Sequence, residues 1–363
     1  MSISTISFNN AARAQIMRVE SQLRDALVET STNRHADVGR TLGRQTANAV
    51  SLRSQETSLD RLLQSNKLVT QRLTLADDTL ETVATTAEGL QNQLITGLGN
   101  DDFLNSARQV AANALDQLIG SANLSVGGQY IFAGTNTDVR PLNGYDAPRV
   151  GEDGTSLPSP KTVAQTHFDD FVAAATDGGG VSALAAGDLE AYFSQAGYTD
   201  GEGNNHRFDD LFSDPRWNEV WSNASDDTIE SRISKSETID SSVSSNGAAF
   251  RDLMAGYVML DLASGDMGEG ARAALSAAAQ GRISGGFSGV TAIRSDLGNR
   301  ISRVEAADES LKQQKDIVAA SLGALEDVDM VEAANRVAAL QTQLEASYRV
   351  TSLIREINIL DYL

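Results

Sequence analysis

The chain has 363 residues, contains no cysteine and carries a formal net charge of −20 at pH 7. Without cysteine it cannot form disulfides, zinc–thiolate sites or a cysteine nucleophile. Its acidity argues against nucleic acid as a partner, because phosphate binding requires clustered Lys and Arg.

Residues 1–30 predict an amphipathic helix with no signal peptide before it. The start lacks the basic residues and the continuous apolar run of a secretory signal, so we expect no cleavable leader. Asn9 or Asn10 can cap the helix that follows. The apolar residues expected at the contact face of this segment are Ile3, Ile6, Phe8, Ile16, Val19 and Leu23.

Residues 45–96 predict a single long helix with two apolar ladders at seven-residue spacing, as at the a and d positions of a coiled coil. Such a helix would be roughly 75 Å long at 1.5 Å per residue. Asn66 is the polar member of one ladder and would fix the helix register at a cost in stability. Gly97 and Gly99 end the helix, and a return helix follows. The ladder residues are Leu52, Leu59, Leu62, Asn66, Val69, Leu73, Leu80, Val83 and Leu90.

The middle of the chain differs from the two flanks in composition. All five prolines lie within residues 141–215, and both tryptophans follow shortly after. Proline interrupts long helices, so we expect an inserted domain with a small core of its own here. The expected elements are helices at 162–174 and 181–196, a short helix opened by Pro215 that carries Trp217 and Trp221, and a strand at 229–233.

The C-terminal flank repeats the long-helix pattern and then breaks. Asp308 and Lys315 interrupt its second apolar row. Asp329, with Glu332 three residues on, predicts an N-cap and capping box for a final helix. The ladder before the break consists of Leu297, Val304, Leu311, Val318 and Leu325. The final helix carries Leu340, Leu344, Val350, Leu353, Ile354, Ile357, Leu360 and Leu363.

These patterns predict a mainly α fold, in which the N- and C-terminal segments form a long antiparallel helical coiled-coil rod and a smaller α/β or mixed outer domain is inserted. We expect a terminal helical assembly domain (1–44 with 329–363), a coiled-coil rod domain (45–140 with 247–328) and an inserted outer domain (141–246). Isolated amphipathic helices are marginal in water, so each chain end needs a partner. The two ends could pair only with each other, or could pair and also pack against neighbouring subunits.

Signals for catalysis or metal binding are weak. Five Asp-Asp dipeptides could hold Mg²⁺ or Ca²⁺, but in so acidic a chain they are more often solvated faces or helix caps. The loop from Asp200 fails the calcium-loop pattern, because Asn205 stands where glycine is needed. The three histidines lie far apart, and no glycine cluster has the spacing of a phosphate loop. We therefore expect no catalytic residue, no metal site, no cofactor and no enzymatic activity.

Several stretches resemble the flagellin superfamily. Residues 127–135 (Gly-Gly-Gln-Tyr-Ile-Phe-Ala-Gly-Thr) are similar to the glycine–aromatic turn that closes the first helical arm in that family. Residues 297–301, 326–330 and 344–348 follow its C-terminal order, and residues 357–363 (Ile-Asn-Ile-Leu-Asp-Tyr-Leu) resemble the close of its hook-associated members. Residues 31–39 depart from the common pattern of the N-terminal arm.

The resemblance implies an extracellular structural subunit of the bacterial flagellum, secreted by the flagellar type III apparatus. A hook-associated member would join hook to filament. Its partners would be further copies of itself in a ring or helical assembly, a neighbouring hook-associated protein, flagellin and an export chaperone on the C-terminal helix, without nucleic acid or membrane insertion. A filament flagellin is the first alternative. A cytoplasmic coiled-coil signalling protein is the second, because it would also be acidic, cysteine-free and rich in heptads.

Overall fold

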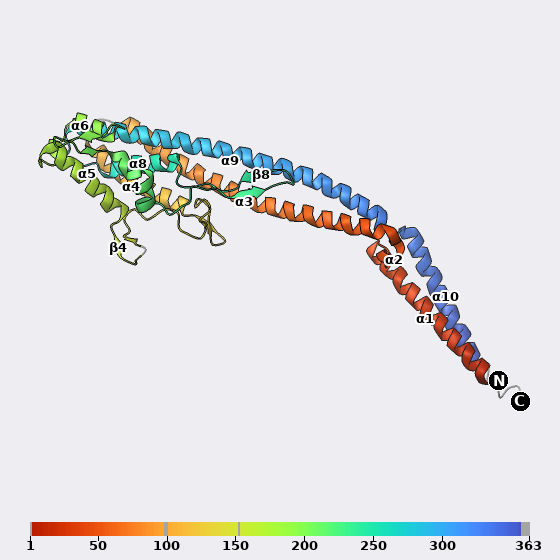
Figure 1. Ribbon diagram of the computed structural model, residues 1–363. Helices are drawn as coiled ribbons and strands as arrows, with labels where there is room; N and C mark the ends of the chain where they lie inside the picture. The colour runs from red at the N-terminus through yellow and green to blue at the C-terminus, as the bar shows by residue number, and fades with distance from the viewer. Residues whose placement is uncertain (1, 98–100, 152, 357–363) are drawn as a thin grey trace. The chain divides into compact units, whose positions relative to one another are not determined.

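The structure, a computed structural model, describes residues 2–97, 101–151 and 153–356 (Figure 1). It is 71% helical, which confirms the mainly α fold predicted from the sequence. The α-helices are α1 (Ser2–Thr32), α2 (Val38–Leu42), α3 (Thr46–Gly97), α4 (Asp101–Ala122), α5 (Pro160–Thr176), α6 (Ala186–Phe193), α7 (Asp214–Arg216), α8 (Ala248–Asp261), α9 (Glu269–Glu326) and α10 (Met330–Glu356). Tighter or wider helical turns are η1 (Gly43–Gln45), η2 (Val181–Ala183), η3 (Phe208–Phe212) and η4 (Trp217–Trp221).

The strands form four separate antiparallel hairpins among the described residues. In the first, Gly127 and Gly128 both have positive φ angles, 60° and 83°, between paired residues Val126 and Gln129. A two-residue turn with two positive φ angles is the type I′ turn that glycine favours. The glycine turn that the resemblance implies within residues 127–135 is therefore present. The strands are β1 (Ser125–Val126), β2 (Gln129–Tyr130), β3 (Arg149–Val150), β4 (Ser156–Leu157), β5 (Tyr198–Thr199), β6 (Asn205–His206), β7 (Glu230–Arg232) and β8 (Thr238–Asp240).

The predicted helix boundaries agree with the structure at α3 and at the break before α10. The backbone N–H groups of Val331 and Glu332 donate to Asp329 Oδ1 at 2.8 and 3.3 Å, which confirms the predicted cap. The cap predicted at Asn9 or Asn10 was wrong, because α1 begins at Ser2 and both residues lie inside it. An interior Asn lowers helix propensity by only a few tenths of a kcal/mol relative to most polar residues, so it does not stop the helix.

The inserted segment contains the predicted elements with one difference. The helix expected over residues 181–196 is divided into η2 and α6. Between them Leu184 is buried and has an extended backbone, with φ −69° and ψ 123°. Placing this side chain in the core requires the chain to leave the helical conformation. The strand expected at 229–233 is present as β7, which pairs with β8.

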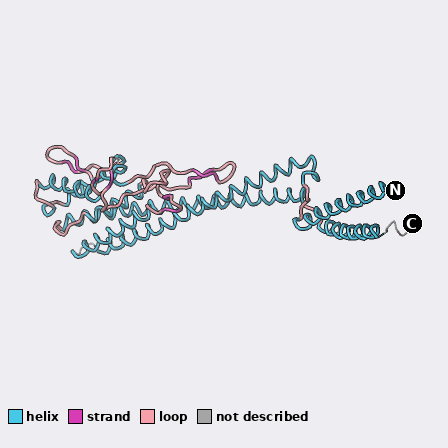
Figure 2. The backbone as a smooth tube through the Cα atoms, turned by 90° about the horizontal axis from the view of Figure 1, so that it is seen from below, coloured by secondary structure: helices cyan, strands magenta, loops and turns pink. Residues whose placement is uncertain are grey.

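The chain divides into two compact units. The terminal unit consists of residues 1–63 and 309–363, and the central unit of residues 64–308. In the central unit, loops and short strands gather along one side of the long helices (Figure 2). The expected division into three domains, with boundaries near residues 44, 140, 246 and 328, remains a prediction.

The core of the central unit is one continuous apolar cluster that joins the inserted segment to the helices. Trp217 and Trp221 are 0% and 1% exposed, and their rings stack at 6.4 Å. Phe212 stacks on Trp221 at 5.0 Å, and Phe171 stacks on Tyr192 at 4.1 Å. The same cluster includes apolar residues of α3, α4, α8 and α9. Aromatic side chains of the insert therefore stabilise the long helices as well as the insert.

Close backbone contact holds α8 against α9. A Cβ atom placed on Gly286 would lie 2.6 Å from Leu253 Cγ, and one on Gly289 would lie 2.7 Å from Ala249 Cβ. Such distances are far below van der Waals contact, so only glycine fits at these two positions. Both helices lie side by side in the central unit (Figure 1).

Candidate assembly surface

The two chain ends pair with each other through α1 and α10. Val19, Ala26 and Leu340 are buried in their seam, and Leu23 and Leu344 pack against these residues. Tyr348 Oη donates to Glu20 Oε1 at 2.7 Å across the same pair. Seven-residue apolar spacing on both helices explains this seam, because residues at such spacing lie on one helix face. The terminal segments thus have the pairing that both sequence interpretations required.

Ion pairs fasten the end of this helix pair. Glu29 Oε2 lies 3.0 Å from Arg336 Nη1, and Glu29 Oε1 lies 3.6 Å from His35 Nδ1. Glu326 is 0% exposed and accepts a hydrogen bond from Arg53 Nη2 at 2.7 Å. Arg34 approaches the same carboxylate at 3.7 Å. A buried carboxylate requires such partners, so this cluster fixes the local path of the chain.

The remaining seam of the terminal unit lies between α3 and α9. Leu59, Leu311 and Val318 are buried there, with Leu52 and Leu62 packed against them. Lys315, which interrupts an apolar row, places its Nζ 2.6 Å from Asp60 Oδ1. Hydrogen bonding to Asp60 raises the pKa of Lys315. Leu325 is half-buried.

The other ladder residues lie in the central unit. Each of them is buried, and all contribute to its apolar cluster except Asn66, whose side chain is polar. They are Asn66, Val69, Leu73, Leu80, Val83, Leu90, Leu297 and Val304.

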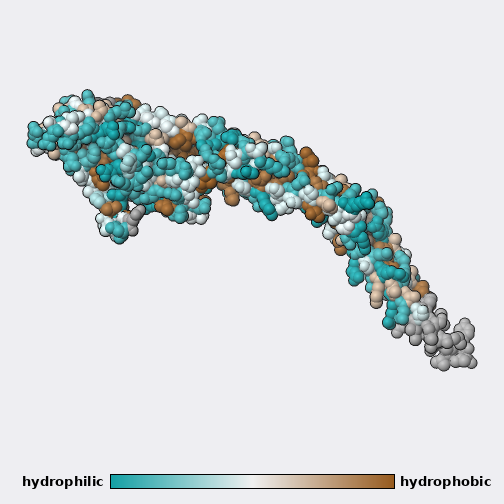
Figure 3. All heavy atoms as spheres, in the orientation of Figure 1, coloured by the Kyte–Doolittle hydropathy of each residue, from teal (hydrophilic) through white to brown (hydrophobic). Residues whose placement is uncertain are grey.

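The terminal pair also exposes apolar residues on its outer sides. Val331, Val350 and Leu353 of α10 are 71%, 53% and 59% exposed, and Met17 and Val28 of α1 are 65% and 46% exposed. At 100° per residue, Val331 and Leu353 lie roughly opposite Leu340 around α10, and Met17 and Val28 lie roughly opposite Val19 around α1. Apolar patches are visible among hydrophilic side chains over these helices (Figure 3).

The expected contact residues therefore separate into three groups. Val19, Leu23, Leu340 and Leu344 lie at the inner seam with Ile16 half-buried nearby, whereas Val350 and Leu353 face outward. The outward residues Met17, Val28 and Val331 were missed, although their apolar character at helix positions away from the main stripe was a usable signal. The side chains of Ile3, Ile6, Phe8 and Ile354, and residues Ile357, Leu360 and Leu363, lie outside the described part of the structure.

Polar clusters elsewhere have structural partners. Arg282 pairs with both Asp209 and Asp252 beside a cavity of about 430 Å³. Asp200 Oδ1 accepts hydrogen bonds from two backbone N–H groups in its own turn, and hydrogen bonds from Asn204 are the main cause that lowers its pKa to about 2. Across the residues that the structure describes, no group of three or more His, Asp or Glu side chains could hold a metal ion.

No helix in the described ranges is both long and apolar enough to span a bilayer.

Comparison with known proteins gives two matching family models. The bacterial flagellin N-terminal helical region matches residues 3–137, and the bacterial flagellin C-terminal helical region matches residues 282–363. A solved structure provisionally assigned as a flagellar hook-associated protein from Vibrio parahaemolyticus is similar at a TM-score of 0.51 and 12% identity. The match covers 77% of this chain and 97% of that one. No curated protein sequence matches the chain.

Proposed function

Because the chain belongs to the flagellin superfamily, whose members are structural proteins of the flagellum, we propose that it is a hook-associated subunit closest to hook-associated protein 3. In this role it joins the hook to the filament. It acts outside the cell, as a component of the flagellum. It assembles with copies of itself, with a neighbouring hook-associated protein and with flagellin.

The observation that carries this proposal is the two-sided apolar character of the α1–α10 pair. One side is buried within the chain, where residues such as Val19 and Leu340 pack against each other. The other side leaves Val331, Val350 and Leu353 more than half exposed. Burying each such side chain contributes about 1.5 to 3 kcal/mol, so a neighbouring subunit that covers the outer side gains several times that amount. We therefore assign the inner side to pairing and the outer side to assembly.

The junction role, as distinct from a general flagellar role, rests on residues 357–363, whose sequence resembles the close of hook-associated members. The similarity to the Vibrio parahaemolyticus structure supports the fold. We also propose that an export chaperone binds the α10 segment before secretion, because that helix carries an apolar stripe that has to be shielded until assembly.

A filament flagellin is the second candidate, favoured by the fact that both matching family models describe flagellin regions. The two roles differ in copy number, with thousands of subunits in a filament against a single ring at a junction. Purified protein that polymerises readily into long fibres would favour the filament role. A cytoplasmic signalling coiled coil is disfavoured by the same family matches.

Deletion of the gene tests the junction role. We expect cells with hooks but without filaments, and flagellin released into the medium. Complementation with the full chain should restore filaments, whereas a chain carrying Val331→Glu, Val350→Glu and Leu353→Glu should not. The matched control is Val150→Glu, at a residue 78% exposed in the central unit. Normal filaments in the deletion strain would exclude the junction role.

A further inference from the structure

Asn66 is the polar member of an apolar ladder, and its side chain is 0% exposed. Its Nδ2 donates to the carbonyl oxygen of Ile233 at 2.9 Å and to Asp308 Oδ1 at 2.7 Å. These acceptors belong to the β7–β8 hairpin and to α9. The side-chain amide of Asn66 in α3 thus binds two other segments, whose contacting residues lie 167 and 242 residues further along the chain. The sequence predicted that Asn66 would set helix register, but the structure gives it a hairpin as partner.

The β7–β8 hairpin fills the place where the seam between α3 and α9 turns polar. Ile233, at the end of β7, is 0% exposed, and Ile239 of β8 is 4% exposed. Asp308 is one of the residues that interrupt the apolar row of α9, and it meets Asn66 at this level. At this level the hairpin contributes the buried apolar side chains of Ile233 and Ile239, which pack in the same cluster as residues of α3 and α9. Figure 1 shows β8 beside α3 and α9.

Two arginines of α9 hold the outer side of the hairpin. Arg303 Nε donates to Glu237 Oε1 at 3.0 Å, and Arg303 Nη2 lies 2.9 Å from the same oxygen. Arg300 Nη1 donates to the carbonyl oxygen of Asp240 at 3.1 Å. The contacts of the two arginines lie at or near the surface, and each is weak alone. The bond from Asn66 to Ile233 is buried and the bond from Asn66 to Asp308 is part-buried, so losing them leaves a buried polar group without a partner. Asn66 is therefore the contact whose loss matters most.

We infer that residues 229–242 form a clasp that fastens α3 to α9 at this polar level, with Asn66 as its anchoring residue. The clasp is a property of the central unit and does not depend on the proposed flagellar role. Ordinary polar residues in a helix seam lower stability while fixing register, so their replacement by Leu tightens the seam. Replacement of a clasp anchor has a different effect, because it releases the hairpin while leaving the helices folded.

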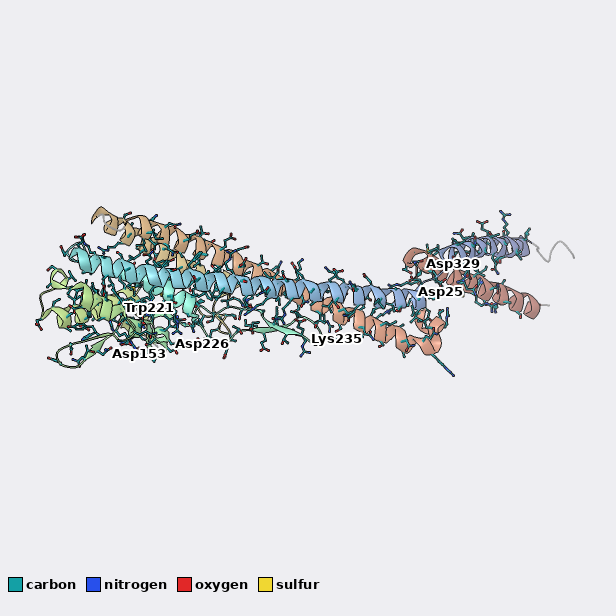
Figure 4. The ribbon with its side chains drawn as sticks, turned by 90° about the horizontal axis from the view of Figure 1, so that it is seen from above. Asp25, Asp153, Trp221, Asp226, Lys235 and Asp329 are labelled. Carbon is teal, nitrogen blue, oxygen red and sulfur yellow. The ribbon has the colours of Figure 1, made fainter. Side chains whose placement is uncertain are left out.

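Trypsin provides a direct test, since Arg232 and Lys235 are exposed on the hairpin, with Lys235 at its tip (Figure 4). Cleavage requires local opening of the segment around the site, so its rate reports the population of the open hairpin. In Asn66→Leu we expect cleavage after Lys235 to be about tenfold faster or more than in the wild type. Cleavage after Arg149, in the β3–β4 hairpin of the central unit, should change less than about twofold.

The matched control is Asn299→Leu, which makes the same change at an exposed position of α9. It should leave all cleavage rates unchanged. If Asn66→Leu does not fold, Arg303→Gln decides the question, because this part-exposed residue can be replaced without a buried defect, and a smaller but specific increase at Lys235 is expected. Unchanged cleavage at Lys235, or an equal increase at Arg149, would overturn the inference.

Discussion

The two units of this chain differ in net charge and in the kind of side chains that form their cores. The terminal unit has 13 basic and 15 acidic residues, a net charge of −2, whereas the central unit has 16 and 34, a net charge of −18. Only Phe8, Tyr348 and Tyr362 of the aromatic residues belong to the terminal unit. It has narrow aliphatic seams and exposed apolar residues, while the central unit has a broad aromatic core.

We infer that this difference separates a unit for association, the terminal one, from a unit that folds on its own, the central one. Like charges oppose the approach of copies, and that repulsion comes almost entirely from the central unit. Near neutrality in the terminal unit allows copies to approach there, where apolar side chains remain exposed. The acidic surface of the central unit then keeps the same copies soluble.

The largest effect on assembly is expected from removal of residues 1–25 or, separately, of residues 339–363. Each deletion removes one partner of the α1–α10 seam, so we expect assembly to be abolished, as measured by sedimentation and electron microscopy. The central unit should stay folded, as judged by the fluorescence of Trp217 and Trp221. If assembly persists after both deletions, the terminal unit is not the assembly surface.

Trp221→Ala should destabilise the central unit by about 3 to 5 kcal/mol, the usual loss for a large buried aromatic side chain. The residue is 1% exposed, and its Nε1 donates to the carbonyl oxygen of Leu211 at 2.8 Å. Denaturant unfolding followed by the fluorescence of Trp217 measures this loss. Val150→Ala, at an exposed residue, should change the unfolding free energy by less than about 0.5 kcal/mol. Equal effects would contradict the assignment of the aromatic core.

Glu326→Ala should weaken the terminal unit by about 2 kcal/mol. The full loss expected for a buried ion pair is reduced here, because Arg53 is about half exposed and can return to water. Hydrogen exchange of amides in α1 and α10 should quicken, while tryptophan fluorescence of the central unit stays unchanged. Glu332→Ala breaks an exposed pair with Arg336 and serves as the control. Faster exchange in the central unit would show that the two units are not independent.

The smallest predicted effect is a change in the pH dependence of the unfolding free energy. Burial lowers the pKa of His167, whose Nδ1 lies 2.8 Å from Tyr192 Oη. The folded state therefore favours the neutral imidazole ring. The stability that the neutral ring contributes is fully present above the unfolded-state pKa of 6.5, and it is lost as the pH falls through the lower pKa of the folded state. The unfolding free energy of the central unit should fall as pH decreases below about 6.5, and His167→Gln should flatten that dependence. An unchanged pH profile in this variant would contradict the assignment.

Local pattern was sufficient to predict α3, the apolar ladder of α9 and the break before α10, whereas α8 (Ala248–Asp261) was not predicted as a separate helix. Seven-residue spacing defines α3 and α9 without reference to other segments, and Asp329 caps a helix that starts next to it. The partner of Asn66 could not be predicted in this way, because Ile233 is 167 residues distant. The outward position of Val331 was missed for a different reason, since its place away from the main apolar stripe of α10 was a signal that the prediction did not use.

The glycines of α9 indicate how much sequence change one helix can absorb along its length. Gly281 and Gly298 have open space where a Cβ atom would lie, so alanine fits there and raises helix propensity by about 1 kcal/mol. Gly286 and Gly289 meet α8 directly and admit no larger residue. In a library of variants across this helix, Gly281 and Gly298 should therefore tolerate alanine, whereas Gly286 and Gly289 should not and should mark the contact with α8.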